Sequence, residues 1–404
     1  MRLGVLATHP IQYHAPLYRA LAERLDLEVY FAHKQTAQGQ AKAGFGVAFE
    51  WDVPLLEGYS SQFLENRAKV PDVSTFWGCS TPEIAGIIAR ERFDAFLVNG
   101  WYNRSLWQAM RACWRTGTPL LVRGDSQLRT PRSLPFRIAK EAFYRAFIPR
   151  FDGYLVVGER AREYYKYYGA REEHMYFVPH FIDNAWFRER AADVDPQALR
   201  TELDVGPDTA LLLFVGKFIQ KKRPADILRA GRQLLDRGQA VQVVLVGSGE
   251  LEADLRDTAR ELAVPANFAG FKNQSELPYY YAGADLLVLP SDGGETWGLV
   301  VNEAMACGLP AVVSDAVGCA PDLIDPGETG EMYPMGDVKA LALALERALP
   351  SAGSPHVSQA LNCKMDVYSL ETATEGVIEA LSSVSAPAAL KPNFSPKWEQ
   401  KQRP

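Results

Sequence analysis

The sequence predicts two doubly wound α/β domains in series. Short apolar segments alternate with amphipathic helical segments over residues 2–122, and the alternation starts again at residue 210. Strands that are apolar throughout are typical of parallel sheets covered by helices on both faces. Residues 188–207, between the two stretches, are charged and poor in large apolar side chains. Because such sheets bind ligands at the carboxyl ends of their strands, two facing sheets predict a deep cleft between domains.

The composition excludes several other classes of protein. Of the 404 residues, 47% are hydrophobic and 23% charged, which excludes a disordered or fibrous chain. A net charge of −6 disfavours a dedicated nucleic-acid binder. The five cysteines contain no CxxC pair, which argues against a disulfide framework or a zinc site and indicates a reducing compartment. We expect the N-terminus to be a first strand rather than a signal peptide, and the protein to be cytoplasmic.

In the N-terminal half, a helix over 16–24 follows the first strand. A second helix is predicted to begin at Thr81, a good N-cap, with proline at the first helical position. Ile84, Ile87 and Ile88 would then share its buried face. The predicted strands of this half are 2–7, 27–31, 93–98 and 119–122.

In the C-terminal half, a helix over 225–237 is closed by Gly238, the expected residue after a helix end. A second helix, over 250–263, has Leu251, Leu255 and Leu262 on one face. These helices separate strands of the same apolar kind as in the first half. The predicted strands are 210–215, 241–246, 266–271, 285–290 and 310–314.

The stretch SDGGETWGLVVNEAMA, residues 291–306, is the most informative in the sequence. A strand is predicted to end just before it, a loop with two glycines follows, and a helix then begins near Gly298. Free backbone N–H groups at Gly298, Leu299 and Val300 would point toward the cleft. A helix N-terminus preceded by glycine is an anion site, suited above all to phosphate.

Two carboxylates belong to this stretch, Glu295 in the loop and Glu303 in the helix, eight positions apart. A carboxylate beside a phosphate site is electrostatically unfavourable, so these groups need another task. Accepting hydrogen bonds from sugar hydroxyls is the task that suits them. The alternative is that Glu295 caps the loop and Glu303 is a solvated helix residue.

Two other loops follow strands and could meet the same ligand. In FVGKFIQKKRP, Gly216 and Lys217 end a strand and Lys222 follows five residues later, where cations could reach a diphosphate. An ordinary basic loop is the alternative. In VLVGSGELEADL, Gly247 and Gly249 form a GxG, which alone is a weak dinucleotide fingerprint. Such glycines often serve only to let the chain turn sharply.

Taken together, residues 210–337 resemble the nucleotide-sugar domain of a GT-B glycosyltransferase of the retaining family 4 type (glycosyl transferases group 1). Glu295 and Glu303 fit the family's E-x7-E motif, and the matching segments occur in the family's order and spacing. These segments are VGKFIQKKRP, LVGSGELEADL, NFAGF, LPYYYAGADLLVLPS, ETWGLVVNEAMACGLPAVVSD and GETGEMY. The resemblance implies the GT-B fold, in which two Rossmann-like domains face each other across a cleft.

The resemblance and the composition together predict the organisation of the chain. A last amphipathic helix, over 370–381, would cross back to the N-terminal domain, and the sequence after it has little that could pack. The expected segments are an acceptor-side domain (1–188), a linker (189–207), a nucleotide-sugar-binding domain (208–362), the returning helix (363–384) and a mobile tail (385–404).

The resemblance also implies roles for individual residues. Lys217, where the family usually has arginine, and Lys222 would neutralise the donor diphosphate. Glu303 would bind the ribose hydroxyls, and Glu295 would contact hydroxyls of the transferred sugar. The backbone at 269–271 would receive the base. The implied donor-binding set is Gly216, Lys217, Lys222, Gly247, Gly249, Gly270, Phe271, Glu295, Thr296, Trp297, Gly298, Leu299, Val300 and Glu303.

The acceptor side departs from the family's pattern. The loop after the first strand reads THPIQYHAP instead of being glycine-rich. We expect His9, Gln12 and Tyr13 to line the cleft, because they follow a strand end. The strand at 119–122 is followed by RGDSQ, which lacks the family's usual histidine. Asp125 could take the place of that histidine or could be a turn residue, and His180 is expected to be structural.

The implied reaction is glycosyl transfer with retention, without a cofactor and without a metal. The catalytic set would be Glu295, Lys222, Lys217 and Asp125, with the two lysines stabilising the departing diphosphate. A front-face substitution fits, because no pair of carboxylates is expected to flank the anomeric carbon as in glycosidases. The expected partners are a nucleotide-sugar, with UDP as its nucleotide, and a lipid-linked or cell-surface glycan precursor. A GT-B epimerase or hydrolase, and a catalytically silent nucleotide-sugar-binding protein, stay open as alternatives.

A basic stretch, residues 123–150, contains seven basic and two acidic residues. Within it, residues 134–148 interleave aliphatic and aromatic side chains with basic ones. Such a helix could lie on an anionic membrane at its inner face, where it would help the enzyme to reach a lipid-linked acceptor. A packed helix with a solvated basic face is the alternative.

Overall fold

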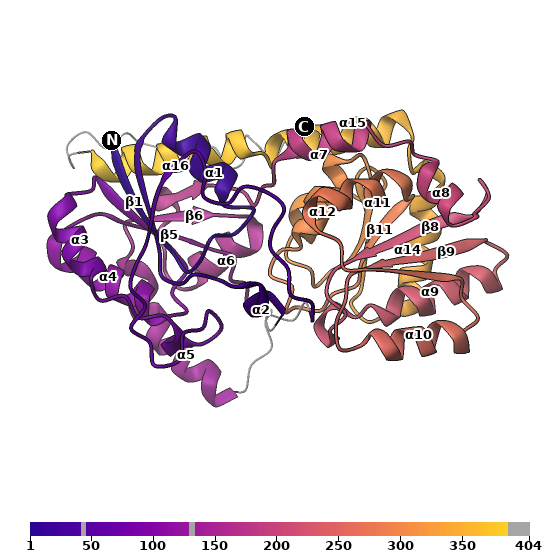
Figure 1. Cartoon of the computed structure of the whole chain (residues 1–404), viewed down its shortest axis with the longest axis horizontal. Helices are drawn as coiled ribbons and strands as arrows, with labels where there is room; N and C mark the ends of the chain where they lie inside the picture. The colour runs from indigo at the N-terminus through magenta and orange to yellow at the C-terminus, as the bar shows by residue number, and fades with distance from the viewer. Residues whose placement is uncertain (42–45, 129–133, 387–404) are drawn as a thin grey trace.

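The computed structural model describes residues 1–41, 46–128 and 134–386, and it contains two parallel sheets in series (Figure 1). The first sheet has seven strands in the order β3-β2-β1-β4-β5-β6-β7, and the second has six in the order β10-β9-β8-β11-β12-β13. In both, the order reverses beside the first strand, as in doubly wound folds. The predicted pair of doubly wound α/β domains is therefore confirmed.

The strands are short, and most of their residues are buried. β8 is an example, since all six residues of ALLLFV are buried between helices on both faces of its sheet. The first sheet consists of β1 (Arg2–Ala7), β2 (Asp26–Phe31), β3 (Ser60–Phe63), β4 (Ala95–Asn99), β5 (Leu120–Gly124), β6 (Gly153–Val156) and β7 (Met175–Phe177). The second consists of β8 (Ala210–Val215), β9 (Val241–Val246), β10 (Ala266–Gly270), β11 (Leu286–Leu289), β12 (Ala311–Ser314) and β13 (Gly330–Tyr333).

The helices cover both faces of each sheet (Figure 1). Those of the N-terminal domain are α1 (Ala15–Ala22), α2 (Ala37–Gln40), α3 (Ile84–Glu91), α4 (Arg104–Thr116), α5 (Leu134–Phe147) and α6 (Glu159–Tyr167). Those that follow are α7 (Asn184–Ala192), α8 (Ala198–Glu202), α9 (Ala225–Asp236), α10 (Glu252–Glu261), α11 (Leu277–Gly283), α12 (Leu299–Ala306), α13 (Ala320–Leu323), α14 (Val338–Ala348), α15 (Pro355–Val367) and α16 (Leu370–Ser385).

Most predicted elements agree with the structure to within one or two residues, but the last helix, expected over 370–381, extends to Ser385, one helix begins later than expected, and one strand was not predicted. The helix expected from Thr81 begins instead at Ile84, and the Thr81 hydroxyl is buried without a partner, so it does not cap the helix. The strand β3 was not predicted. Its sequence, SSQF, is polar and lies at the edge of the sheet, so it lacks the apolar pattern of a buried strand.

The segment predicted as a linker, 189–207, is largely folded. It holds the end of α7 and all of α8, and α8 packs on α11 through Leu199, which is buried. A side chain at Gly283 would collide with Leu199, so the glycine permits this close approach. The charged composition of the segment reflects the exposed faces of two short helices rather than an extended connection.

The end of the chain returns across both domains as two helices (Figure 1). α15 packs on α12 of the second domain, and α16 packs on α1, β6 and β7 of the first. The predicted boundary at 362/363 therefore falls inside α15, and the break between the helices lies at Tyr368-Ser369. The predicted mobile tail lies outside the described residues from 387 onward.

Only part of the basic stretch can be described, because residues 129–133 and the side chains of 134–139 lie outside the described residues. In the remainder of α5, Phe147 is buried, whereas Phe143 is 49% exposed. Arg145 forms an ion pair with Glu141 one turn earlier. Within the described residues, no helix is both long enough and apolar enough to cross a membrane.

Candidate functional site

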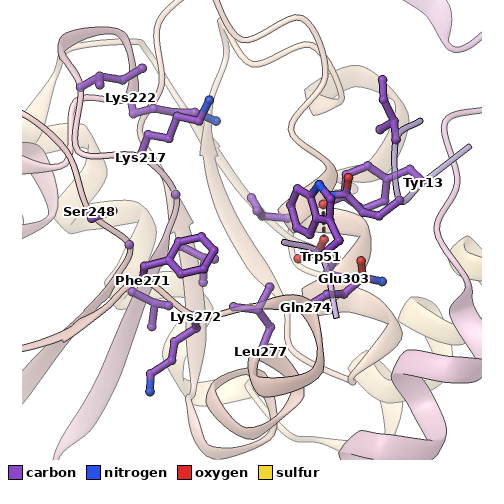
Figure 2. A pocket seen from close by; sticks show the side chains of 18 of the residues that line it. Tyr13, Trp51, Lys217, Lys222, Ser248, Phe271, Lys272, Gln274, Leu277 and Glu303 are labelled. Atoms are coloured by element: carbon purple, nitrogen blue, oxygen red, sulfur yellow. Dashed lines mark hydrogen bonds between the residues drawn. The ribbon is translucent and has the colours of Figure 1, made fainter. Parts of the chain in front are cut away.

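A cavity of about 560 Å³, here called the large cavity, lies between the two sheets where their strands end (Figure 2). From the N-terminal domain, His9, Gln12 and Tyr13 line it, all from the loop after β1. From the C-terminal domain, its lining comes from loops after β8, β9 and β10 and from α12. The members of the predicted donor set that line it are Gly216, Lys217, Lys222, Gly247, Phe271, Val300 and Glu303.

Three lysines, Lys217, Lys221 and Lys222, line one end of the large cavity. Figure 2 shows Lys217 and Lys222 at this end, with Tyr13, Trp51 and Glu303 on another side. Burial, together with the neighbouring charges of Lys221 and Lys222, lowers the pKa of Lys217 to about 8. An anion between these ammonium groups would relieve their mutual repulsion, so this end of the cavity is suited to a diphosphate.

Lys222 forms an ion pair with Glu295, and both side chains are nearly buried, at 14% and 12% exposure. The hydroxyl of Ser291 lies 3.5 Å from the same carboxylate. The predicted pair of a lysine for phosphate and a glutamate for sugar is thus in direct contact. A ligand that carries both groups could separate them by offering an oxyanion to Lys222 and hydroxyl donors to Glu295.

Glu303 is almost fully buried at the floor of the large cavity. Its two carboxylate oxygens accept hydrogen bonds from the hydroxyls of Tyr13, at 2.6 Å, and Tyr281, at 2.5 Å. Burial raises the pKa of Glu303 to about 7, against the opposing effect of these two donors and of Lys222. A carboxylate that already binds two hydroxyls is suited to bind the two hydroxyls of a ribose once Tyr13 moves aside.

Gly247 and Gly249 lie in a turn beside the large cavity, where the neighbouring backbone leaves no room for a side chain. Both have positive φ angles, 142° and 156°. A Cβ at Gly247 would lie 1.9 Å from the carbonyl oxygen of Gly216, and one at Gly249 would lie 2.6 Å from that of Phe218. The turn after β9 therefore presses directly on the loop that carries Lys217, and glycine is required at both positions.

The loop 291–298 is fixed by the N-terminal domain. Asp125 accepts a hydrogen bond from the Thr296 hydroxyl at 2.6 Å, and the Gln127 amide donates to the carbonyl of Gly293 at 2.8 Å. Arg160 donates to Gln127 at 3.0 Å and to the carbonyl of Ala316 at 2.6 Å. Asp125, predicted at the acceptor side, thus reaches the loop that also carries Glu295.

Some residues of the predicted donor set lie behind the cavity wall. Trp297 is 4% exposed, donates to Asn302 at 2.8 Å and packs on His180 and Tyr368. Its side chain therefore stabilises the contact between domains. Gly298, at a φ of 103°, is the residue from which α12 begins, as predicted. Two members of the set in the first turn of α12 do line a cavity. Val300 lines the large cavity, and Leu299 lines a second cavity, described below.

A second cavity, of about 340 Å³ and here called the small cavity, lies in the N-terminal domain. Ile11 and Tyr13 line both cavities, so the two adjoin. The lining residues that matter below come from the ends of β4 and β5, from α1 and from the segment after β7. They include Thr8, His14, Tyr102, Arg123, Asp125 and His180.

The lining residues that were not predicted as site residues include Arg123, His14 and His180 in the small cavity and Trp51 in the large one. A signal for Arg123 was present, because it is the polar residue in the otherwise apolar strand LLVRG and stands next to the strand's end. His180 was expected to be structural. Trp51 has no local signal, since it follows no strand and belongs to no periodic pattern.

The region of Trp51 brings the N-terminal domain over the loop after β10. The ring of Phe49 lies 4.4 Å from that of Phe271, and the amide of Asn273 donates to the carbonyl of Glu50 at 2.8 Å. Trp51 and Phe271 both line the large cavity at the end where the base is expected. Aromatic faces on both sides are suited to hold a planar ring.

Among the described residues, no three or more His, Cys, Asp or Glu side chains are grouped closely enough to hold an ion.

The sequence of the C-terminal domain matches that of a known family. Residues 196–358 match the model of glycosyl transferases group 1. The chain is 29% identical over 246 residues to D-inositol 3-phosphate glycosyltransferase of Nocardia farcinica, covering 57% of this chain and 51% of that protein. It is 34% identical over 157 residues to sulfoquinovosyl transferase SQD2 of Arabidopsis thaliana, covering 38% and 29%. The first of these matches spans about half the length of the relative.

Solved structures resemble the whole chain more broadly. Alr3699/HepE of Anabaena, solved in complex with UDP, superposes with a TM-score of 0.69 at 18% identity, over 95% of this chain and 100% of that one. Sucrose-phosphate synthase of Thermosynechococcus elongatus gives a TM-score of 0.67 at 18% identity, over 94% and 98%. Two facing Rossmann-like domains with these matches define the GT-B class. The match to the glycosyl transferases group 1 family covers residues 196–358.

Proposed function

We propose that the protein is a retaining glycosyltransferase that moves a sugar from UDP to a hydroxyl of a lipid-linked or cell-surface glycan precursor, without a metal. The observation that carries the proposal is the large cavity. Three lysines line it, together with a buried carboxylate, Glu303, that is already bound by hydroxyl groups. Glu295 is not a lining residue, but it forms an ion pair with one of these lysines, Lys222. This arrangement suits the diphosphate, the transferred sugar and the ribose of one nucleotide-sugar.

Each group has a task in the reaction. Lys217 and Lys222 stabilise the charge that develops on the departing diphosphate, and the first turn of α12 adds its positive dipole end. These groups supply the positive charge that a divalent cation would otherwise provide. Glu295 accepts hydrogen bonds from hydroxyls of the transferred sugar and so orients its anomeric carbon.

The acceptor hydroxyl approaches from the small cavity. Asp125, which lines the small cavity and is held by Thr296, positions it. The bond between the anomeric carbon and the phosphate oxygen breaks, the acceptor oxygen bonds to the same face of that carbon, and the hydroxyl proton goes to the departing phosphate. Retention of the anomeric configuration follows.

UDP as the nucleotide is supported by the UDP complex of the structural relative HepE and by the aromatic base end of the large cavity. We expect UDP to raise the unfolding temperature more than GDP, ADP or CMP does. A ligand that binds only the folded state stabilises it by about 2.7 kcal/mol at ~100 times its dissociation constant. Stabilisation by none of the four would favour a catalytically silent protein, and stabilisation by another nucleotide would correct the donor.

Catalysis is tested by Glu295→Gln, with Glu328→Gln as the matched control on an exposed turn. We expect the first variant to lose at least about 100-fold in kcat, as when one transition-state contact is removed, and to keep its affinity for UDP. The control should match the wild type. Unchanged turnover of Glu295→Gln would remove Glu295 from the mechanism. An inverted product, read from its anomeric proton coupling, would overturn retention, and loss of activity in EDTA would overturn metal independence.

A further inference from the structure

Arg123, near the end of β5, is a buried cation without a carboxylate partner. It is 6% exposed, and among the described residues its guanidinium forms no ion pair. Its polar contacts are long ones: 3.4 Å to Nε2 of His14, 3.4 Å to the carbonyl of Pro179 and 3.5 Å to Nδ1 of His180. The ring of Phe181 lies 5.7 Å from the guanidinium carbon.

The groups around Arg123 add donors rather than acceptors. If each imidazole accepts from the guanidinium, its other nitrogen carries a proton, and those nitrogens, Nδ1 of His14 and Nε2 of His180, have no partner. Nε of Arg123 and the hydroxyl of Tyr165 also lack partners. Three of these four unsatisfied buried atoms, all N–H donors in this arrangement, belong to residues that line the small cavity, namely His14, Arg123 and His180.

Arg123 carries the positive charge of this cluster. Burial, with the neighbouring charge of Arg123, lowers the pKa of His14 to about 3 and that of His180 well below its usual value. Both imidazoles are therefore neutral near pH 7. The carboxylate of Asp125 lines the same cavity and its charge acts on Arg123, but it forms no ion pair with the guanidinium among the described contacts and accepts from the Thr296 hydroxyl at 2.6 Å.

A buried charge without a partner destabilises a folded protein, and each unsatisfied buried donor adds to that cost. Such a group persists where a ligand completes it. The ligand must be an oxyanion, because a guanidinium fork and N–H donors match the oxygens of a carboxylate or a phosphate. It must also be small, because the cavity of about 340 Å³ is near the lower end of the range for small-molecule sites.

We propose that the small cavity binds an acceptor that carries an oxyanion, a carboxylate or a phosphate, held by Arg123 together with His14 and His180. The proposal rests on the proposed function, because the small cavity is its acceptor side. Asp125 would then receive the hydroxyl of the acceptor while Arg123 holds its charged end. The acceptor class becomes an anionic sugar or polyol rather than a neutral one.

The test measures affinity for three probes at constant ionic strength by calorimetry: glucose 6-phosphate, glucuronate and glucose. The wild type should bind at least one anionic probe at least tenfold more tightly than glucose. Arg123→Gln should lose that preference. Lys222→Met, which alters the lysine end of the large cavity, should keep it. Preference for glucose 6-phosphate alone supports a phosphate acceptor, and preference for glucuronate supports a carboxylate one.

Three results would overturn the proposal: equal affinity of the wild type for all three probes, an anion preference that persists in Arg123→Gln, or one that is lost only in Lys222→Met. The last would place the anion in the large cavity. The unfolding temperature distinguishes ligand binding by Arg123 from a structural role. If Arg123 serves the ligand, Arg123→Gln should not lower this temperature. If that variant does not fold, Arg123→Lys keeps the charge and should bind the anionic probe more weakly than the wild type does.

UDP binding separates this proposal from the proposed function. Arg123→Gln should bind UDP as the wild type does, because Arg123 does not line the large cavity. If the wild type binds no nucleotide but prefers an anionic probe through Arg123, the proposed donor fails and the anion site stands. If it binds UDP but prefers no anionic probe, the anion site fails and the proposed donor stands.

Discussion

Lys222 and Arg123 are both cations in the walls of adjoining cavities, one in each domain, and their surroundings differ. Lys222 is paired with Glu295, whereas Arg123 faces neutral imidazoles and unsatisfied donors. A paired cation contributes to the folded state before any ligand arrives, and an unpaired one depends on its ligand. Lys222 on the donor side is thus paired without a ligand, and Arg123 on the acceptor side is not.

The comparison predicts the largest effect at Lys222. Lys222→Met would leave Glu295 nearly buried without its cation, so both folding and catalysis should suffer. We expect a loss of roughly 1–3 kcal/mol in unfolding free energy, less than the ~3–5 kcal/mol of a fully buried pair because both side chains retain some exposure. The loss in kcat should be at least about 100-fold. Urea unfolding and steady-state kinetics measure the two.

The double variant Lys222→Met with Glu295→Gln serves as the control for this prediction. It removes the uncompensated charge, so it should recover most of the stability and none of the activity. A single variant as stable as the wild type would show that the ion pair contributes nothing to folding, and the contrast with Arg123 would fail.

Asp322 extends the comparison from buried cations to a buried anion. Its carboxylate is bound mainly by neutral donors. Its carboxylate accepts from the backbone N–H of Glu159 at 2.9 Å and from the Tyr368 hydroxyl at 2.8 Å, and it joins the two domains. Burial raises its pKa to about 7, against the effect of these donors. The folded state therefore binds a proton more readily than the unfolded state does between about pH 4 and pH 7.

Because the folded state holds the extra proton, Asp322 makes the protein less stable as the pH rises through this window. Asp322→Asn keeps the shape and removes the titration. The variant should therefore gain stability relative to the wild type as the pH rises from 5 to 7, by at most ~1.4 kcal/mol per pH unit. Denaturant unfolding at both pH values gives the difference. A constant difference between the two proteins would contradict the raised pKa.

The smallest effect is expected where an ion pair is exposed. Arg145 and Glu141 are joined one helical turn apart on α5, and Arg145 is 54% exposed. Arg145→Gln should change the unfolding free energy by no more than about 0.5 kcal/mol, as is typical of such pairs. A larger loss would show that exposure does not explain why the Lys222–Glu295 and Arg145–Glu141 ion pairs differ in their contribution to stability.

The same variant tests the predicted membrane contact of the basic stretch. If that stretch lies on an anionic surface, Arg145→Gln should bind anionic vesicles more weakly, by about 1 kcal/mol. Equal sedimentation of both proteins with such vesicles would leave the packed helix as the interpretation.

How far the sequence predicts the site depends on how local each contact is. Glu295 and Glu303 belong to one strand–loop–helix unit, and Lys217 and Lys222 to another, so their places follow from spacing and from the ends of strands. The partners of Glu303 do not, because Tyr13 lies 290 residues away in the sequence. The Arg123 cluster joins α1, β5 and the segment after β7, and no local pattern brings those elements together.

The fold shows the same limit. Apolar strands such as β8 were placed to the residue, whereas β3 was missed, because a polar edge strand has the composition of a loop. The linker was misjudged for a related reason. α8 is too short to show a helical period, and its single buried anchor, Leu199, is recognisable only beside Gly283.

The return of α16 to the first domain has a consequence for synthesis. The apolar face of α16, with Val377 and Leu381 in the same core as Leu17 and Leu21 of α1, is made last. At 5–20 residues per second, the ribosome needs about 10–40 s to proceed from the end of β7 to the end of α16. During that interval the part of the first sheet that α16 covers, at β6 and β7, is exposed, so the nascent N-terminal half is the part of this chain that most needs a chaperone.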